Sequence, residues 1–169
     1  MDMLRSLEIT DILIIDRLVL DFQAGLNVLT GETGAGKSIL LDALGFVLGW
    51  RGRADLVRSG AKQGEVVAVF DLPPGHPCHG VLQEAGIAAE EGELILRRVN
   101  SGEGRKTAWV NGVRASGDLL RQLSDRLVEL HGQHDDKGLL NVRGHRALLD
   151  AFAGADLDGV RAAWRARRA

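Results

Sequence analysis

The strongest constraint on the fold is a glycine-rich octet, GETGAGKS, at residues 31–38. It fits the pattern G-x-x-x-x-G-K-[ST] and lies between an apolar segment, residues 26–30, and a segment whose apolar residues recur every three or four positions, as in a helix. A strand, such a loop and a helix, in this order, form the context in which the pattern binds phosphate. The sequence therefore predicts a short buried strand at 26–30, a phosphate-binding loop, and a helix over 37–48 that ends at Gly49.

Each part of the octet has a chemical role. Its glycines let successive backbone N–H groups point at phosphate oxygens, Lys37 neutralises the β and γ phosphates, and the Ser38 hydroxyl ligates Mg²⁺. The positive amino-terminal end of the following helix adds to the attraction. ATP and Mg²⁺ are therefore the expected cofactors; the alternative, a flexible turn without a ligand, is disfavoured by the flanking elements. The expected nucleotide-binding residues are Gly31, Glu32, Thr33, Gly34, Ala35, Gly36, Lys37 and Ser38.

The rest of the chain predicts an α/β fold. Alternating apolar residues favour strands at 4–10, 16–22, 65–72, 93–99 and 105–110, and a further strand is expected at 127–131. Helices are expected near 81–85 and over 117–127. Ser116 is a suitable cap for the second of these helices, and Asn111-Gly112 predicts a two-residue hairpin.

Composition indicates the class of protein and its compartment. A chain of 169 residues with 45% hydrophobic residues is sufficient for one globular domain. The single Cys78 excludes an internal disulfide, and the acidic residues within 1–20 argue against a secretion signal or a membrane span, so we expect a cytoplasmic protein with no membrane partner. Because the net charge is -2, any contact with DNA has to come from a local basic patch.

A P-loop enzyme also needs an aspartate at the end of a second apolar strand, where it helps to hold Mg²⁺. Two segments imitate that strand: ILIID, which ends at Asp16, and VVAVFD, which ends at Asp71. The first continues directly into another strand, and the second is followed by Leu-Pro-Pro rather than by a second acid. Ordinary sheet strands explain both segments better, so the catalytic aspartate is expected outside this chain.

Further segments give the chain a family resemblance. A strand pair, then GLNVLTGETGAGKSILLDALGFVLG, RADLVRSG, LRRV with VNG, and LVELHGQHD together resemble the N-terminal half of the ATPase head of the RecN family, bacterial DNA-repair proteins related to SMC ATPases. The resemblance covers residues 4–153. It implies an α/β, ABC/SMC-type P-loop NTPase head lobe over 1–153, with a mixed sheet around the P-loop helix, and the start of a coiled-coil helix over 154–169. The absence of an LSGG-like sequence fits a split head whose other half carries the ABC signature and the Walker B strand.

The same resemblance implies an activity and partners. In that family ATP clamps two heads face to face, and its hydrolysis releases them during DNA double-strand-break repair and recombination. The expected partners are the C-terminal half of the same head, a second head in a homodimer, and DNA, in a cytoplasmic, nucleoid-associated location. Gln133, in LHGQHDDKGLL, corresponds to the Q-loop glutamine, which joins the Mg²⁺ shell and senses the attacking water. Without the resemblance, Gln133 would be interpreted as a solvent-facing glutamine. With the resemblance, Lys37 and Gln133 are the expected catalytic residues.

Two other interpretations of the function stay open. The chain alone is expected to bind ATP without turnover, so one alternative is a nucleotide-binding module that has no catalysis of its own and acts as partner for the C-terminal half of the head. A small nucleotide kinase is a weaker alternative, because the sequence has no arginine-rich lid or acceptor-site pattern.

Clusters of histidines and of basic residues have both an ordinary and a functional interpretation. His131 and His134 with the two aspartates that follow, and HPCH at 76–79, offer too few convergent ligands for a zinc site. The basic residues after the P-loop helix and around the hairpin are solvated side chains or, in the functional interpretation, contacts to DNA phosphates. Adjacent Arg97 and Arg98 should point to opposite faces of the sheet. The basic residues concerned are Arg51, Arg53, Arg58, Arg97, Arg98, Arg105, Lys106 and Arg114.

Overall fold

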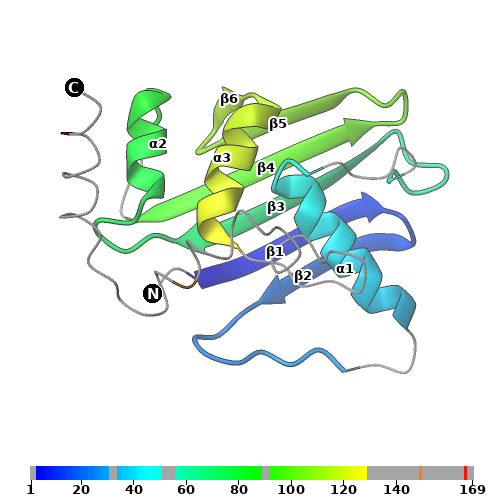
Figure 1. The fold of residues 1–169 in the computed structure, drawn as a ribbon. Coiled ribbons are helices and arrows are strands. Elements are labelled where there is room, and N and C mark those ends of the chain that lie inside the picture. Colours follow the sequence, from blue (N-terminus) through cyan, green and yellow to red (C-terminus); the bar gives the residue numbers. More distant parts are fainter. Residues whose placement is uncertain are drawn as a thin grey trace. The chain divides into compact units, whose positions relative to one another are not determined.

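The computed structural model describes residues 3–30, 34–50, 56–88 and 92–128, together with Leu149 and Ala166, which are helical. The chain divides into two compact units, residues 1–128 and residues 129–169. Within its described residues, the first unit consists of a six-stranded sheet and three helices (Figure 1). The predicted boundary between 153 and 154 lies outside the described residues, and of the predicted coiled-coil segment, 154–169, only Ala166 is described.

The sheet has the strand order β2-β1-β3-β4-β5-β6, and every described pair of neighbouring strands is antiparallel. The strands predicted at 4–10, 16–22, 65–72, 93–99 and 105–110 are confirmed. Of the strand predicted at 127–131, only Leu127 and Val128 are described, and Leu127 still belongs to a helix. The bounds are β1 (Met3–Ile12), β2 (Ile15–Asp21), β3 (Gln63–Asp71), β4 (Glu93–Ser101), β5 (Lys106–Val110) and β6 (Val113–Ala115).

One face of the sheet is apolar and is covered by helices. Val66, Ala68 and Phe70 of β3 are buried and alternate with more exposed residues, as do Leu94 and Leu96 of β4. Helix α1 (Gly34–Val47) packs on β1, β3 and β4, and helix α3 (Gly117–Leu127) lies beside it over the same face, with α2 (Cys78–Glu84) packed against α3 (Figure 1). The three predicted helices are confirmed, and α1 begins three residues earlier than its apolar pattern suggested.

Local sequence signals determine where the elements turn. Asn111 and Gly112 both have positive φ angles, 47° and 77°, as a two-residue hairpin requires, because its twist then matches that of β5 and β6. The Ser116 hydroxyl accepts a hydrogen bond of 3.1 Å from the Leu119 N–H and so caps α3. Gly49, with φ at 87°, ends α1 in the conformation that favours glycine.

The prediction of a strand at 26–30 is wrong. Residues 26–30 belong to no strand, and Leu26, Val28 and Leu29 are 92%, 70% and 49% exposed. A buried strand needs hydrogen-bonded neighbours and side chains that cover its faces. No described strand pairs with this segment, so its apolar side chains lie on the surface beside the octet.

Among the described residues, no helix combines the length and the apolar content that crossing a membrane requires.

Candidate nucleotide site and basic pocket

The octet and helix α1 form the candidate nucleotide site. Gly31, Glu32, Thr33 and Gln133 lie outside the described residues, as do the side chains of residues 34–37. The backbone from Gly34 onward is helical, so the unpaired N–H groups of the first turn of α1 belong to the second half of the octet. That turn contains no acidic residue, so no carboxylate competes with a phosphate for these donors, and the Ser38 side chain is exposed.

The other end of α1 is firmly anchored. Phe46 and Val47 are fully buried against the sheet, and the Trp50 indole N–H donates to the Ser124 hydroxyl of α3 over 2.8 Å. A Cβ atom at Gly49 would lie 2.7 Å from the Cβ of Leu120, so α1 and α3 approach each other closely at this point. The helix that carries the octet is thus held in place by both the sheet and α3.

The two aspartates that imitate a magnesium ligand are both engaged by arginines. Asp16 Oδ1 accepts from Arg58 Nη2 over 2.7 Å, and Asp71 Oδ1 accepts from Arg5 Nη1 over 3.3 Å. Arg58 also donates to Asp11 over 2.7 Å, and that hydrogen bond, together with the charges of Asp16 and Asp11, raises the pKa of Arg58. Ion pairs of ordinary sheet strands therefore account for Asp16 and Asp71.

Arg97 and Arg98 point to opposite faces of the sheet, as predicted. Arg97 donates two hydrogen bonds to the Glu65 carboxylate, over 2.9 and 2.7 Å, and lies over the Trp109 ring; the hydrogen bond to Glu65 raises the pKa of Arg97. Arg98 lies on the helical face, where its Nη1 donates to the Phe46 carbonyl over 2.6 Å and its guanidinium is 4.8 Å from the centre of the Phe46 ring. Burial, and then the charge of Arg121, lowers the pKa of Arg98.

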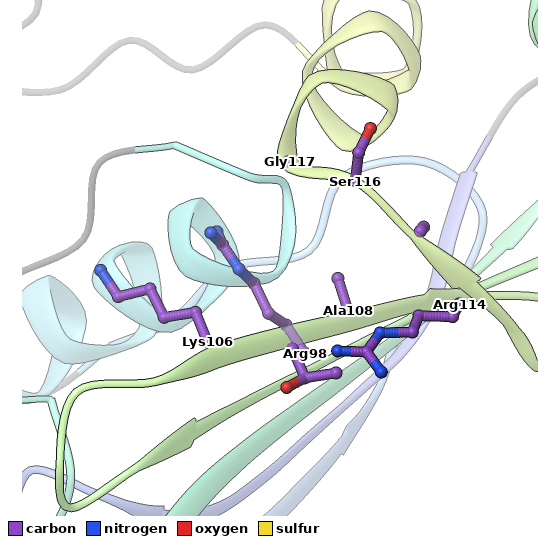
Figure 2. Close-up of a pocket in the computed structure, with 8 residues that line it drawn as sticks. Arg98, Lys106, Ala108, Arg114, Ser116 and Gly117 are labelled. Atoms are coloured by element: carbon purple, nitrogen blue, oxygen red, sulfur yellow. The ribbon is translucent and has the colours of Figure 1, made fainter.

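Arg98 also lines a pocket of about 220 Å³ at the edge of the sheet where β6 leads into α3. Figure 2 shows Arg98 and Lys106 on the helical face of the sheet and Arg114, which pairs with Trp109, on the opposite face at the same edge, together with Ser116 and Gly117 at the start of α3. The three cationic side chains come from three different strands, β4, β5 and β6. We refer to it as the basic pocket.

The sequence identifies only part of the basic pocket. Arg98, Lys106 and Arg114 are among the basic residues noted around the hairpin, but Ser116 is recognised only as a helix cap, and the Phe46 carbonyl that fixes Arg98 is not recognised. A usable signal exists in the spacing, because a capping serine two residues after Arg114 places the amino end of a helix beside a basic strand.

Backbone and side-chain groups of the HPCH segment, residues 76–79, form local hydrogen bonds. The Cys78 N–H donates to His76 Nδ1 over 3.1 Å, and His79 Nε2 donates to the Pro73 carbonyl over 3.1 Å. The buried Cys78 thiol is 3.7 Å from the Leu123 carbonyl. In the part of the chain that the structure describes, no three metal-ligating side chains come together; His131 and His134 lie outside it.

Residues 6–104 match the model of the AAA domain family. The DNA repair protein RecN of Halalkalibacterium halodurans is 44% identical to this chain over 158 residues, and RecN of Bacillus subtilis is 42% identical over 158 residues. Both alignments cover 94% of this chain, but only 28% and 27% of the relatives, so the chain spans little more than a quarter of the length of the curated relatives that it matches.

Solved structures of SMC heads have the same fold. A chain from a study of ATP-driven dimerization and DNA-stimulated activation of SMC ATPases matches with a TM-score of 0.61 and 24% identity, over 87% of this chain and 97% of that chain. The SmcHead bound to the C-winged helix domain of ScpA matches with a TM-score of 0.59 and 26% identity, over 76% of this chain and 42% of that chain. The fold is therefore an SMC head-like α/β P-loop NTPase fold with a mixed sheet, of which the six antiparallel strands are the described part.

Proposed function

This chain belongs to the AAA domain family as a RecN-like, SMC-type P-loop ATPase head segment, and we propose that it is the ATP-binding lobe of a two-lobed head that acts in DNA double-strand-break repair and recombination. The observation that carries the proposal is the position of the octet. It runs directly into the amino-terminal turn of α1, a helix fixed on the sheet and on α3, so its backbone N–H groups are held ready for phosphate.

The residues of this site suit MgATP. The first turn of α1 has no carboxylate, its N–H groups are unpaired within the helix, and Ser38 supplies an exposed hydroxyl. In the proposed site Lys37 holds the β and γ phosphates, Ser38 ligates Mg²⁺, and Gln133 completes the metal shell and orients the attacking water. When bound, MgATP supplies the phosphoryl group that is transferred to water.

Exposed apolar side chains next to the octet support the second lobe as a partner. Leu26 and Val28 before the octet are largely exposed, and Leu29 and, on α1, Leu41 are about half exposed. Exposed apolar side chains are candidates for contact with a partner, and three of these four lie within four consecutive residues. We propose that the C-terminal half of the head covers them and brings the Walker B acids, and that a second head supplies the opposing signature motif in an ATP-dependent homodimer.

DNA is the further proposed partner. Its phosphates are natural ligands for unpaired basic side chains. Among the described residues, no carboxylate pairs with Arg105, Lys106 or Arg114. Arg51 and Arg53, the other basic residues expected to contact DNA after the P-loop helix, lie outside the described part of the chain. Location in the cytoplasm, at the nucleoid, follows from this proposal.

Calorimetry with Mg²⁺ tests the proposed nucleotide site. Lys37→Ala should abolish most of the ATP and ADP affinity and leave the far-ultraviolet circular dichroism unchanged, because Lys37 interacts with ligand charge rather than with the core. Lys62→Ala, the same change at an exposed lysine before β3, is the control and should bind as the parent does. Equal affinity in the Lys37→Ala variant and the parent would refute the P-loop assignment.

Reassembly of the two halves of the head distinguishes the proposed ATPase lobe from the alternative, a nucleotide-binding module with no catalysis of its own. The chain alone should bind ATP without turnover under either proposal. Adding the C-terminal half of the head should produce turnover that rises more than linearly with protein concentration, because two heads have to meet. A reassembled head that binds ATP but stays inactive at every concentration would favour the module.

A further inference from the structure

We propose that strand β2 is a docking edge for a second copy of this chain, so that two heads join edge to edge through paired β2 strands. In this pairing the two copies of Val19 face each other across a twofold axis. The contact goes beyond the ATP-dependent homodimer proposed above, because it needs neither nucleotide nor a signature motif. Figure 1 shows β2 as the last strand at one side of the described sheet.

The outer edge of β2 has the features of a strand that can accept another strand. Within the described residues β2 pairs with β1 alone, so the backbone groups along its other side have no strand partner. Edge strands are commonly short, or are protected by proline, lysine or a bulge. β2 is seven residues long, has neither proline nor lysine, and pairs one for one with β1 over residues 17–21. The residues that follow, 23–30, are exposed and belong to no strand, so they do not cover this edge.

The side chains of β2 alternate between the two faces of the sheet. Leu18 and Leu20 lie opposite buried residues of β1, so they point to the helical face, and both are half-buried. Arg17, Val19 and Asp21 therefore point to the other face, and all three are exposed. An added strand would meet leucines on one face and an alternation of charge and valine on the other.

Charge selects one register for two β2 strands. A twofold axis through an antiparallel pair sets one residue opposite its own copy, and residues equally far from it on either side opposite each other. With Val19 on the axis, Arg17 of each copy lies opposite Asp21 of the other, and Leu18 then lies opposite Leu20. With Leu18 or Leu20 on the axis, a charged side chain faces Val19. With Arg17 or Asp21 on the axis, like charges face each other, which is destabilising.

Both charges of the selected register are available. Asp21 is exposed, and among the described residues no basic side chain pairs with it. Arg17 Nη2 donates to Glu8 Oε1 over 3.1 Å, but the Arg17 side chain is 70% exposed. Because a guanidinium has five N–H donors, Arg17 can keep Glu8 and also bind Asp21 of the other copy.

The pairing also removes apolar surface from water. Val19 is 49% exposed, and its copy would lie beside it, with the two Cβ atoms about 4.5–5.5 Å apart. On the helical face, Leu18 and Leu20 of the two copies would continue the apolar layer of β1 across the junction. A second copy of β2 matches both faces at once, whereas a strand of unrelated sequence would have to supply the charges and the leucines in the same alternation.

A cysteine on the axis tests the contact. Val19→Cys in the full-length protein should form a disulfide-linked dimer under mild oxidation without nucleotide, because Cβ atoms about 4.5–5.5 Å apart are close to the separation that a disulfide spans. Val113→Cys is the matched control, since Val113 is also 49% exposed but lies on β6, at the far side of the sheet. The dimer on a non-reducing gel should be several-fold more abundant for Val19→Cys, and the parent protein gives the background from its own cysteines.

Charge reversal in the Val19→Cys background tests the register. Arg17→Asp sets like charges opposite each other, and so does Asp21→Arg, so each variant alone should lose the cross-link. An equimolar mixture of the two variants should regain it, because both pairs between them then join opposite charges. Recovery in the mixture also shows that both variants are folded. Asp125→Arg, the same reversal at an exposed position of α3, should leave the yield unchanged.

The remaining outcomes would overturn the proposal. Equal yields from Val19→Cys and Val113→Cys would indicate random collision. No cross-link at Val19→Cys would show that the β2 edge stays open or is covered by another segment. A cross-link that needs ATP and is lost in the Lys37→Ala background would assign the contact to the ATP-dependent homodimer. Continued cross-linking of either charge-reversal variant alone would contradict the register.

Discussion

Replacement of Asn100 by leucine should stabilise the protein. Asn100 lies on β4 with no exposed surface, and neither atom of its side-chain amide has a hydrogen-bond partner among the residues that the structure describes. A buried polar group without a partner costs about 1–3 kcal/mol, and an apolar group of the same shape removes that cost. Leucine has the same number of side-chain heavy atoms and the same branching as asparagine. We therefore expect Asn100→Leu to raise the free energy of unfolding by about 1–3 kcal/mol.

Urea unfolding followed by circular dichroism measures this change. With a urea m value of about 2 kcal/mol/M, a gain of about 2 kcal/mol moves the midpoint up by about 1 M. Asn111→Leu is the matched control with the opposite sign, because the Asn111 amide accepts from the Ile95 N–H over 2.8 Å and donates to the Ala88 carbonyl over 2.7 Å, and because its φ of 47° disfavours leucine. A lower midpoint for Asn100→Leu, with an unchanged m value, would refute the reasoning by showing that the amide is satisfied.

Two further predictions concern the end of α1 and the catalytic glutamine. Gly49→Ala should destabilise the protein by about 2 kcal/mol or more, because the backbone at Gly49 has a positive φ and an added Cβ would lie 2.7 Å from the Leu120 Cβ. Gly117→Ala is the control, because a Cβ at Gly117 meets open space. Equal urea midpoints for the two variants would contradict the expectation. In a head reassembled with its C-terminal half, Gln133→Ala should lower kcat more than it lowers ATP affinity, because a group that places the attacking water acts mainly in the transition state. Steady-state kinetics measures kcat, and calorimetry measures the affinity. A loss of affinity with unchanged kcat would show that Gln133 is not a catalytic residue.

Local sequence signals predict most of the described fold because their physical causes are local. The alternation of apolar residues in β3 and β4, the Asn111-Gly112 hairpin and the Ser116 cap each depend on residues within a few positions of one another. The segment 26–30 has the same apolar character as these strands, but whether it forms a strand depends on a neighbour that pairs with it. That neighbour is a property of the tertiary structure, so the sequence pattern alone gave the wrong result here.

Prediction from the sequence is limited in the same way for the basic residues of the candidate site, because their ion pairs depend on the tertiary structure. Counting arginines from the sequence does not distinguish a neutralised cation from an available one, because an ion pair depends on strand register. Arg97 pairs with Glu65 since β3 and β4 align in the register that sets Val67 opposite Arg97, which leaves Glu65 two positions away on the same face. One residue further along, Arg98 faces the helices and meets a carbonyl and a ring instead of an acid. Since the two residues are chemically identical, only the fold decides which of them is neutralised by a carboxylate.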